Sequence, residues 1–351
     1  MKDLFDKNKE FKSDINTSPL SAKRKEKSLL KMMFLFFASF IIILAVIFFV
    51  FVFKASSTFS IVSQQITSFL GISAAKFPVA DPAERNRLDI LILGIRGDED
   101  PYGGKLTDTI ILASIDTKTY ETALISIPRD TYLKFPIVNI SAKINEAYEV
   151  GEQKQRNGGG IALAKLAVSE VAGVNIDYAI VVDFTAFKET VDLMGGIDVN
   201  VTKKFSENLQ WGGINFSFEP GVHHMDGDTA LLYARSRFTT SDFDRARRQQ
   251  EIILAIRQKA ESMGLSASPQ KAFKLLDILG RNVKTDLTVS EITKLFSVVK
   301  KIENSKPNLK VLDTSGGLLF STYSTEGAYI LLPTKGDFSD VHDFVRNIFT
   351  E

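Results

Sequence analysis

The chain has 351 residues and no cysteine, and its 43 lysines and arginines nearly balance 42 acidic residues, which gives a formal net charge of +1. A charge this close to zero argues against nucleic acid as a partner held by bulk electrostatics, so any anion site has to be built locally. The absence of cysteine excludes disulfides, thiol catalysis and thiolate metal sites. An exported domain must then rely on its core, which the 44% hydrophobic content permits.

An uncharged apolar run over residues 32–53, between Lys31 and Lys54, dominates the N-terminal part of the chain. A helix rises about 1.5 Å per residue and the core of a bilayer is about 30 Å thick, so about 20 apolar residues span it. The run is long enough, and the basic residues before it are expected to stay in the cytoplasm. We therefore predict a cytoplasmic tail over 1–31, a single-pass anchor in the cell membrane over 32–53, and an extracytoplasmic remainder.

A cleaved signal peptide is the alternative, for which Ala55-Ser56-Ser57 is a weak cleavage candidate. Signal peptides have a shorter apolar region of about 7–15 residues, so the sequence favours an uncleaved anchor. Residues 54–86 then form an extracytoplasmic connector, interrupted by Pro78 and Pro82, and residues 87–351 form one domain.

Strands and helices alternate from residue 88 onward, which predicts an α/β layered domain. The expected strands are short apolar runs bounded by Gly, Asp or Pro. One helix is expected to stop at Gly195-Gly196. The predicted strands cover 88–93, 109–115, 122–127, 178–183, 197–201, 309–312 and 328–332, and the predicted helices cover 161–171, 185–194, 226–234, 243–263, 270–279 and 289–302.

The helix predicted over 243–263 carries charge next to its apolar face. At about 100° per residue, Arg245, Arg248 and Gln249 fall within about 60° of the stripe of isoleucines, whereas Arg247 points to solvent. Guanidinium groups turned inward usually meet carboxylates or phosphates, because an unpaired buried charge is costly. The carboxylates available nearby in the sequence are Asp226, Asp228, Asp242 and Asp244, so a set of structural ion pairs is the alternative to an anion site.

Two further charged residues lie at the ends of predicted strands. Arg129 follows the strand over 122–127, where binding residues of open α/β sheets usually gather. Asp108 precedes the strand over 109–115, after a Gly-rich, acidic loop. Several arginines together with a carboxylate able to hold a hard cation predict a site for pyrophosphate.

Other motifs carry no chemistry of their own. Gly158-Gly159-Gly160 lacks the lysine of a phosphate-binding P-loop, and the sequence has no G-x-S-x-G nucleophile elbow. His223 and His224 are expected in a turn with a structural role, and Trp211 is expected in a loop.

The ordered motifs of the chain resemble those of the LytR–CpsA–Psr family of bacterial envelope proteins. These motifs are LDILILG, LTDTIIL, SIPRDT, KINEAY, VDF followed by VDLMGGIDV, and DGDTALLYARSR followed by DFDRARRQQ. They occur in the family's order over a motif-bearing core at 88–263, and the short tail with a single anchor matches as well. The resemblance implies a layered α-β-α domain with a central mixed sheet, preceded by one transmembrane helix.

The resemblance also implies a phosphotransferase that moves a glycopolymer from a polyprenyl-pyrophosphate carrier to a peptidoglycan sugar hydroxyl at the outer face of the lipid bilayer. The carrier's lipid would occupy a long apolar pocket, and Mg²⁺ or Mn²⁺ would be the cofactor. The resemblance implies catalytic roles for Arg129, Arg235, Arg237 and Asp108. It implies that the same three arginines bind the pyrophosphate together with Arg245, Arg248 and Gln249. It also implies that Asp108 binds the metal, and Asp242 is a second acidic position near the arginines.

The chain departs from the family's pattern at one point. The family commonly has an aspartate soon after the first strand's glycine, where this chain has Arg96. Either Asp98 or Asp100 takes over the metal role through a shifted loop, or Arg96 itself contacts phosphate.

Two alternative functions stay open: a polyprenyl-pyrophosphate pyrophosphatase, and a non-catalytic lipid-binding regulator of the envelope. The proton acceptor stays open as well, between Asp108 and Asp242.

Overall fold

The computed structural model describes residues 86–98, 100, 103–208, 215–263, 283–302 and 305–350. The predicted tail and anchor, the connector up to residue 85, Trp211 and the helix predicted over 270–279 lie outside these residues. Within the described ranges, no helix is both long and apolar enough to cross a bilayer.

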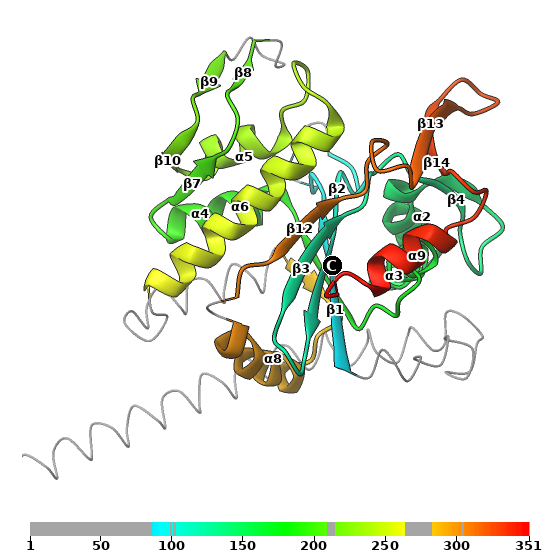
Figure 1. Ribbon diagram of the computed structural model, residues 1–351, viewed down its shortest axis with the longest axis horizontal. Coiled ribbons are helices and arrows are strands. Elements are labelled where there is room, and N and C mark those ends of the chain that lie inside the picture. The colour runs from blue at the N-terminus through cyan, green and yellow to red at the C-terminus, as the bar shows by residue number, and fades with distance from the viewer. Residues whose placement is uncertain are drawn as a thin grey trace, which may run out of the picture. The chain divides into compact units, whose positions relative to one another are not determined.

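A six-stranded mixed sheet forms the centre of the domain (Figure 1). Strand β1 (Arg87–Gly94) pairs antiparallel with β2 (Thr109–Asp116) and parallel with β6 (Tyr178–Val182). The strand order is β11-β6-β1-β2-β3-β12, which confirms the predicted α/β class with a mixed sheet. The other three strands are β3 (Thr122–Ser126), β11 (Val283–Thr285) and β12 (Asn308–Val311).

The apolar run of β1 is divided between the two faces of the sheet. Leu91 and Leu93 are fully buried in a core that also contains α3 (Gly159–Ala172) and α9 (Ser339–Arg346). Ile90 and Ile92 are half-buried and point to the other face, because successive strand side chains alternate. One face is therefore closed by helices, and the other retains space beside it.

A second core lies among α4 (Phe184–Leu193), α5 (Gly227–Arg235) and α6 (Asp242–Met263). These elements confirm the helices predicted over 185–194, 226–234 and 243–263. The core is completed by strands β7 (Ile197–Val201), β8 (Phe205–Glu207), β9 (Phe216–Phe218) and β10 (Gly221–Met225). In Figure 1 these elements lie together at upper left, with α6 crossing toward the sheet.

The turn predicted for His223 and His224 is wrong, since both residues lie in β10, which pairs antiparallel with β7. His224 Nδ1 lies 2.7 Å from Asp198 Oδ1 on the opposite strand. The strand was hidden because its hydrophobicity does not follow its burial: Val222 is 70% exposed, whereas the polar His223 is partly buried. The expected structural role of the two histidines fits this cross-strand pairing.

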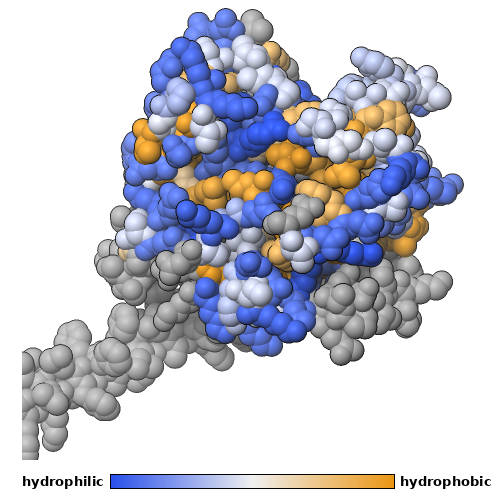
Figure 2. Space-filling view, in the orientation of Figure 1, coloured by the Kyte–Doolittle hydropathy of each residue, from blue (hydrophilic) through white to orange (hydrophobic). Residues whose placement is uncertain are grey.

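Several short elements had no sequence prediction. A β4–β5 hairpin (Tyr132–Lys134 and Ser141–Lys143) leads through the 3₁₀ turn η3 (Ile144–Glu146) to α2 (Ala147–Lys154). After α8 (Val289–Ile302) and β12, which were both predicted, the unpredicted strand β13 (Leu319–Tyr323) pairs with β14 (Tyr329–Pro333) in a second hairpin. Figure 2 shows that the end of this hairpin is pale, with apolar residues gathered below it across the middle of the same face.

Strand β14 also supports a segment far away in the sequence. Leu331 bridges Thr131, and its backbone N–H donates to the carbonyl oxygen of Asp130 at 2.9 Å. The chain just after Arg129 is thus fixed by the C-terminal hairpin. The strand predicted over 328–332 is confirmed. Its additional contact with the loop at Asp130 and Thr131 is not indicated by local sequence patterns.

Gln250 ties α6 to the sheet and provides a stability prediction. Its buried Nε2 lies 2.8 Å from the Lys310 carbonyl oxygen, 2.9 Å from Ser126 Oγ and 3.2 Å from the Leu124 carbonyl oxygen. Gln250→Leu leaves these acceptors unpaired, so we expect it to lower the free energy of unfolding by about 1–3 kcal/mol in urea titrations. Gln258→Leu, at an exposed position of the same helix, is the control and should change it by less than about 0.5 kcal/mol. Equal effects of the two variants would contradict the role of Gln250.

Candidate active site

A cavity of about 690 Å³ lies between the open face of the sheet and helices α4, α5 and α6. Its floor includes the end of β1, where Gly94 is required because a Cβ there would come within 2.8 Å of Thr109 Cβ on the paired strand β2. One part of the lining is apolar and comes from the sheet and all three helices: Ile92, Val182, Phe184, Phe187, Leu231, Ile252, Ile253 and Ile256.

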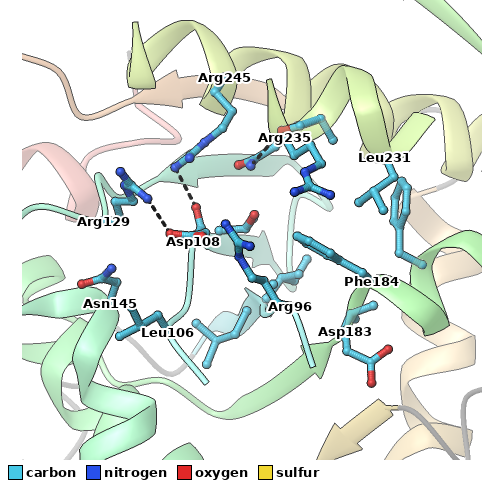
Figure 3. Close-up of a pocket in the computed structure, with 18 of the residues that line it drawn as sticks. Arg96, Leu106, Asp108, Arg129, Asn145, Asp183, Phe184, Leu231, Arg235 and Arg245 are labelled. Carbon is cyan, nitrogen blue, oxygen red and sulfur yellow. Dashed lines mark hydrogen bonds and ion pairs between the residues drawn. The ribbon is translucent and has the colours of Figure 1, made fainter. Parts of the chain in front are cut away.

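The other part of the lining is strongly cationic. Figure 3 shows Arg96, Arg129, Arg235 and Arg245 directed toward one central space, with Asp108 between two of them. Lys143 and Arg237 also line the cavity, so six cationic side chains face three carboxylates, which are Asp108, Asp130 and Asp183. Asp183 points away in Figure 3 and caps α4 by accepting a hydrogen bond from the Ala186 N–H at 2.8 Å. The remaining excess of positive charge favours an anionic ligand.

A network of ion pairs joins the ends of β2, β3 and α6. Arg129 Nη1 lies 2.6 Å from Asp108 Oδ1, and Arg129 Nε lies 3.5 Å from Asp242 Oδ1. Arg245 is 4% exposed and pairs with Asp242 at 2.8 Å, while it also donates to the Asp108 carbonyl oxygen at 2.9 Å. The ion-pair alternative thus describes Arg245 correctly, although the same side chain also lines the cavity.

Burial and charge oppose each other in this network. Burial acts to lower the pKa of Arg129, but Asp108, Asp242 and Asp130 outweigh it, so that pKa is raised. Burial raises the pKa of Asp242 against the pull of Arg245 and Arg129. Burial lowers the pKa of Arg245 more than its carboxylate neighbours raise it. Arg129 is therefore the firmly charged group, positioned by three carboxylates at the rim of the cavity.

Arg235 lies in a different environment. Its guanidinium stacks over the Phe184 ring at 5.1 Å from the centroid, and no carboxylate in the described ranges forms an ion pair with it. Burial lowers the pKa of Arg235, and the like charge of Arg96 lowers it further. Arg96 Nη1 is 3.9 Å from Asp100 Oδ1. Two guanidiniums that repel each other in one cavity are stabilised when an anion binds between them.

The remaining predicted phosphate ligands fall into two groups. Gln249 and the exposed Arg237 line the cavity. Arg248 does not line it, since Nε donates to the Tyr233 carbonyl oxygen at 3.0 Å, Nη1 donates to Thr240 Oγ1 at 3.2 Å, and Nη2 donates to the Ser236 carbonyl oxygen. Its guanidinium also stacks 4.0 Å from the Phe205 ring centroid. The geometry therefore makes Arg248 a support of the segment that carries Arg235 and Arg237.

The two predicted metal ligands do not line the same cavity. Asp108 lines the cationic cavity, whereas the exposed Asp98 lines a neighbouring pocket. Within the described part of the chain, no group of three acidic or histidine side chains could hold a metal ion by itself. Asp108 still fits Mg²⁺, which is often held by one or two carboxylates together with the phosphate oxygens of a substrate. The metal role of Asp98 stays a prediction that this geometry does not support.

Sequence reasoning missed Lys143, Asp130 and Asn145, which all line the cavity. Lys143 Nζ lies 2.6 Å from Asp130 Oδ1, and Asp130 Oδ2 lies 3.7 Å from Arg129 Nε. The available signal was the KINEAY motif, which contains Lys143 and Asn145 but had no role assigned to it.

Comparisons with known proteins agree with this architecture. A model described as the LytR_cpsA_psr family matches residues 55–335. The polyisoprenyl-teichoic acid–peptidoglycan teichoic acid transferase TagU of Oceanobacillus iheyensis is 34% identical over 235 residues, which cover 66% of this chain and 68% of the relative. The crystal structure of B. subtilis TagU matches at a TM-score of 0.53 and 27% identity, over 75% of this chain and 96% of that one.

A further solved structure, TagT bound to LIIa-WTA, has a TM-score of 0.57 at 24% identity and covers 80% of this chain and 96% of that one. At this identity the likeness shows the fold alone. The family model, in contrast, matches most of the chain, including all of the motifs quoted above. The chain therefore belongs to the LytR–CpsA–Psr family.

Proposed function

We propose that this protein is a membrane-anchored phosphotransferase that moves a glycopolymer from a polyprenyl-pyrophosphate carrier to a peptidoglycan sugar hydroxyl, forming a phosphodiester. The observation that carries the proposal is one cavity in which a cluster of guanidiniums adjoins an apolar chamber. A lipid pyrophosphate has the same two parts. The relatives' activity as teichoic acid–peptidoglycan transferases supports this reading, with teichoic acid as the first polymer to test.

In this proposal the donor lies in the cavity in one orientation. The pyrophosphate is held by Arg129, Arg235, Arg237 and Arg245, with Gln249 supporting them and Arg96 adding charge beside Arg235. Guanidiniums suit this task because their fixed donors match phosphate oxygens in pairs. The polyprenyl chain lies along the apolar lining, between the half-buried face of β1 and the inner sides of α4 and α6. Arg248 acts through the backbone segment that it holds.

Energy for the reaction arrives with the donor. The acceptor hydroxyl oxygen attacks the sugar-bearing phosphorus, a new P–O bond forms, and the bond from that phosphorus to the bridging pyrophosphate oxygen breaks. Polyprenyl phosphate leaves with the electron pair, and the arginines stabilise the charge that grows on it. Of the two carboxylates considered as proton acceptors, Asp108 lines the cavity and Asp242 does not.

Mg²⁺ or Mn²⁺ fits the same site, with Asp108 as its protein ligand. When bound with the pyrophosphate, such an ion neutralises phosphate charge. The described residues offer no complete metal cage, so the substrate's oxygens would have to complete the coordination.

The site also fits a location at the cell envelope, where the relatives act on peptidoglycan. The predicted N-terminal anchor would keep the domain next to a membrane-resident donor. A single-pass orientation with a cytoplasmic N-terminus stays part of the proposal.

The test uses the full chain in detergent micelles with a polyprenyl-pyrophosphate oligosaccharide, a short peptidoglycan oligomer and Mg²⁺. Mass spectrometry of a phosphodiester-linked product would support transfer. Release of inorganic or sugar phosphate at the same rate with and without the acceptor would favour the pyrophosphatase. A donor that binds tightly and stays unchanged with every acceptor tried would favour the lipid-binding regulator.

Asp108→Asn separates the enzyme from the regulator. We expect transfer to fall by about 10²-fold, because the variant removes a carboxylate that orients Arg129 and holds the cation. Asp228→Asn, at an exposed carboxylate paired with Lys188, should keep the normal rate. If Asp108→Asn leaves both the transfer rate and the envelope phenotype unchanged, the carboxylate has no catalytic role.

A further inference from the structure

A second pocket of about 580 Å³ adjoins the cationic cavity. Its side chains come from the loop after β1 and from α2 and its C-terminal end: Asp98, Lys105, Glu149, Glu152, Gln153 and Arg156. Gly103 and Gly104 line both cavities, so the two spaces share a wall made of backbone. A ligand in the second pocket would therefore lie next to the site where the phosphate is proposed to bind.

The two cavities differ in charge. The first has six cationic side chains against three carboxylates, while the second has three carboxylates, two cations and an amide. A pyrophosphate is attracted to the first cavity and not to the second. Carboxylate oxygens accept hydrogen bonds from hydroxyl groups, and a glutamine amide both donates and accepts them. The second pocket thus suits an uncharged, hydroxyl-rich ligand.

A buried hydroxyl next to this pocket has no partner. Tyr148 is 0% exposed, and its Oη has no hydrogen-bond partner within the described structure. Burial raises the pKa of Tyr148, and the charges of Glu152 and Asp98 raise it further, so the group is a neutral donor beside two carboxylates of the pocket. Tyr148 itself lines neither cavity, so its hydroxyl bears on the pocket only through its charge interaction with Glu152 and Asp98.

Glu152 is held in place by the glycines that precede α3. Its Oε1 accepts hydrogen bonds from the N–H groups of Gly158 and Gly160, both at 3.3 Å. A Cβ on Gly160 would come within 2.7 Å of Glu152 Cγ and 2.8 Å of the Tyr148 ring. The triple glycine therefore lets α3 approach α2 closely, and its N–H groups fix the Glu152 carboxylate at one wall of the pocket.

We propose that this second pocket is a saccharide subsite, which holds a neutral sugar beside the reacting phosphorus. The inference rests on the proposed function, in which both the donor and the acceptor carry a sugar at that position. The shared chemistry is a ring with several hydroxyl groups, recognised by the carboxylates and the glutamine of the pocket. Whether the sugar belongs to the donor or to the acceptor is decided by the experiment.

The variants are Glu149→Ala and Gln153→Ala, at two residues that line the second pocket and not the first. Glu149 is a partly exposed helix residue and Gln153 an exposed one, so both changes should preserve the fold while each removes a hydrogen-bonding group of the pocket. Lys154→Ala is the matched control, since Lys154 is an exposed residue of α2 that lines neither cavity. Thermal unfolding of each variant verifies that the fold is kept.

Calorimetry on the full chain in micelles then measures the Kd of three probes: polyprenyl pyrophosphate without sugar, the same carrier with a disaccharide, and a soluble peptidoglycan oligosaccharide. We expect both variants to weaken a sugar-bearing probe by about tenfold or more and to leave the sugarless carrier unchanged. Weaker binding of the oligosaccharide assigns the subsite to the acceptor, and weaker binding of the disaccharide carrier alone assigns it to the donor. Unchanged Kd values for both sugar probes would overturn the subsite.

The proposed function fails separately from the subsite. If the wild-type chain does not bind the sugarless carrier, the pyrophosphate site is wrong, whatever the oligosaccharide does. If the carrier binds and the variants change no sugar probe, only the subsite is wrong.

Discussion

Arg235→Ala is expected to lower the rate of glycopolymer transfer by at least about 10²–10³-fold, with a melting temperature close to that of the wild type. The side chain reaches the cavity, stacks on Phe184, and forms no ion pair with a described carboxylate. Its removal therefore leaves no buried partner charge behind, and it relieves the repulsion from Arg96. The variant should instead raise the activation free energy of transfer, because charge on the leaving phosphate increases in the transition state. Single-turnover transfer and thermal unfolding on the same preparation measure both quantities.

Arg247→Ala is the control for this experiment, because Arg247 lies on the solvent side of α6 and pairs with Asp244 and Asp313. It should retain transfer. A steep fall in the melting temperature of Arg235→Ala would show that the arginine is needed for folding instead, and its proposed role at the phosphate would then be wrong.

Arg248→Ala should behave in the opposite way, with a loss of stability of about 2–4 kcal/mol. The guanidinium is buried, and its removal takes away hydrogen bonds to the Tyr233 and Ser236 carbonyl oxygens and the stacking on Phe205. The rate of transfer should fall as well, because the backbone between Arg235 and Arg237 loses hydrogen bonds that hold it in place. Urea unfolding monitored by circular dichroism measures the first effect.

The comparison with Arg247→Ala is again informative, since the two arginines are neighbours on one helix with different exposure. A variant of Arg248 that keeps its full stability and loses all transfer would show direct phosphate binding, as the resemblance implied. Arg248→Lys offers a graded case, because one ammonium cannot reach three acceptors in the fixed geometry of a guanidinium.

The sequence was informative where the physical cause was local. The helical spacing correctly placed Arg245 inward and Arg247 outward, because a helix repeats every 3.6 residues regardless of its neighbours. The same count turned Arg248 inward without revealing that it meets the backbone of α5. Its acceptors are carbonyl groups, which every residue has, so no side-chain pattern distinguishes them from phosphates.

Local sequence patterns did not predict which side chains from distant segments lie together. The position of Lys143 beside Asp130 depends on a hairpin whose strands are three residues long. The separation of Asp98 from Asp108 depends on the path of the loop between β1 and β2. Both follow from tertiary packing, which short polar stretches do not encode by periodicity. The sequence therefore predicted which types of side chain form the site more reliably than which residues lie together in it.

The hydrogen bond between Leu331 and Asp130 has a consequence for the order in which the protein becomes competent. The loop that follows Arg129 is synthesised well before β14, the strand that supports it. A nascent chain that has already produced every arginine of the cavity still lacks the support for Arg129. We therefore expect the site to take its final form only after β14 has been synthesised.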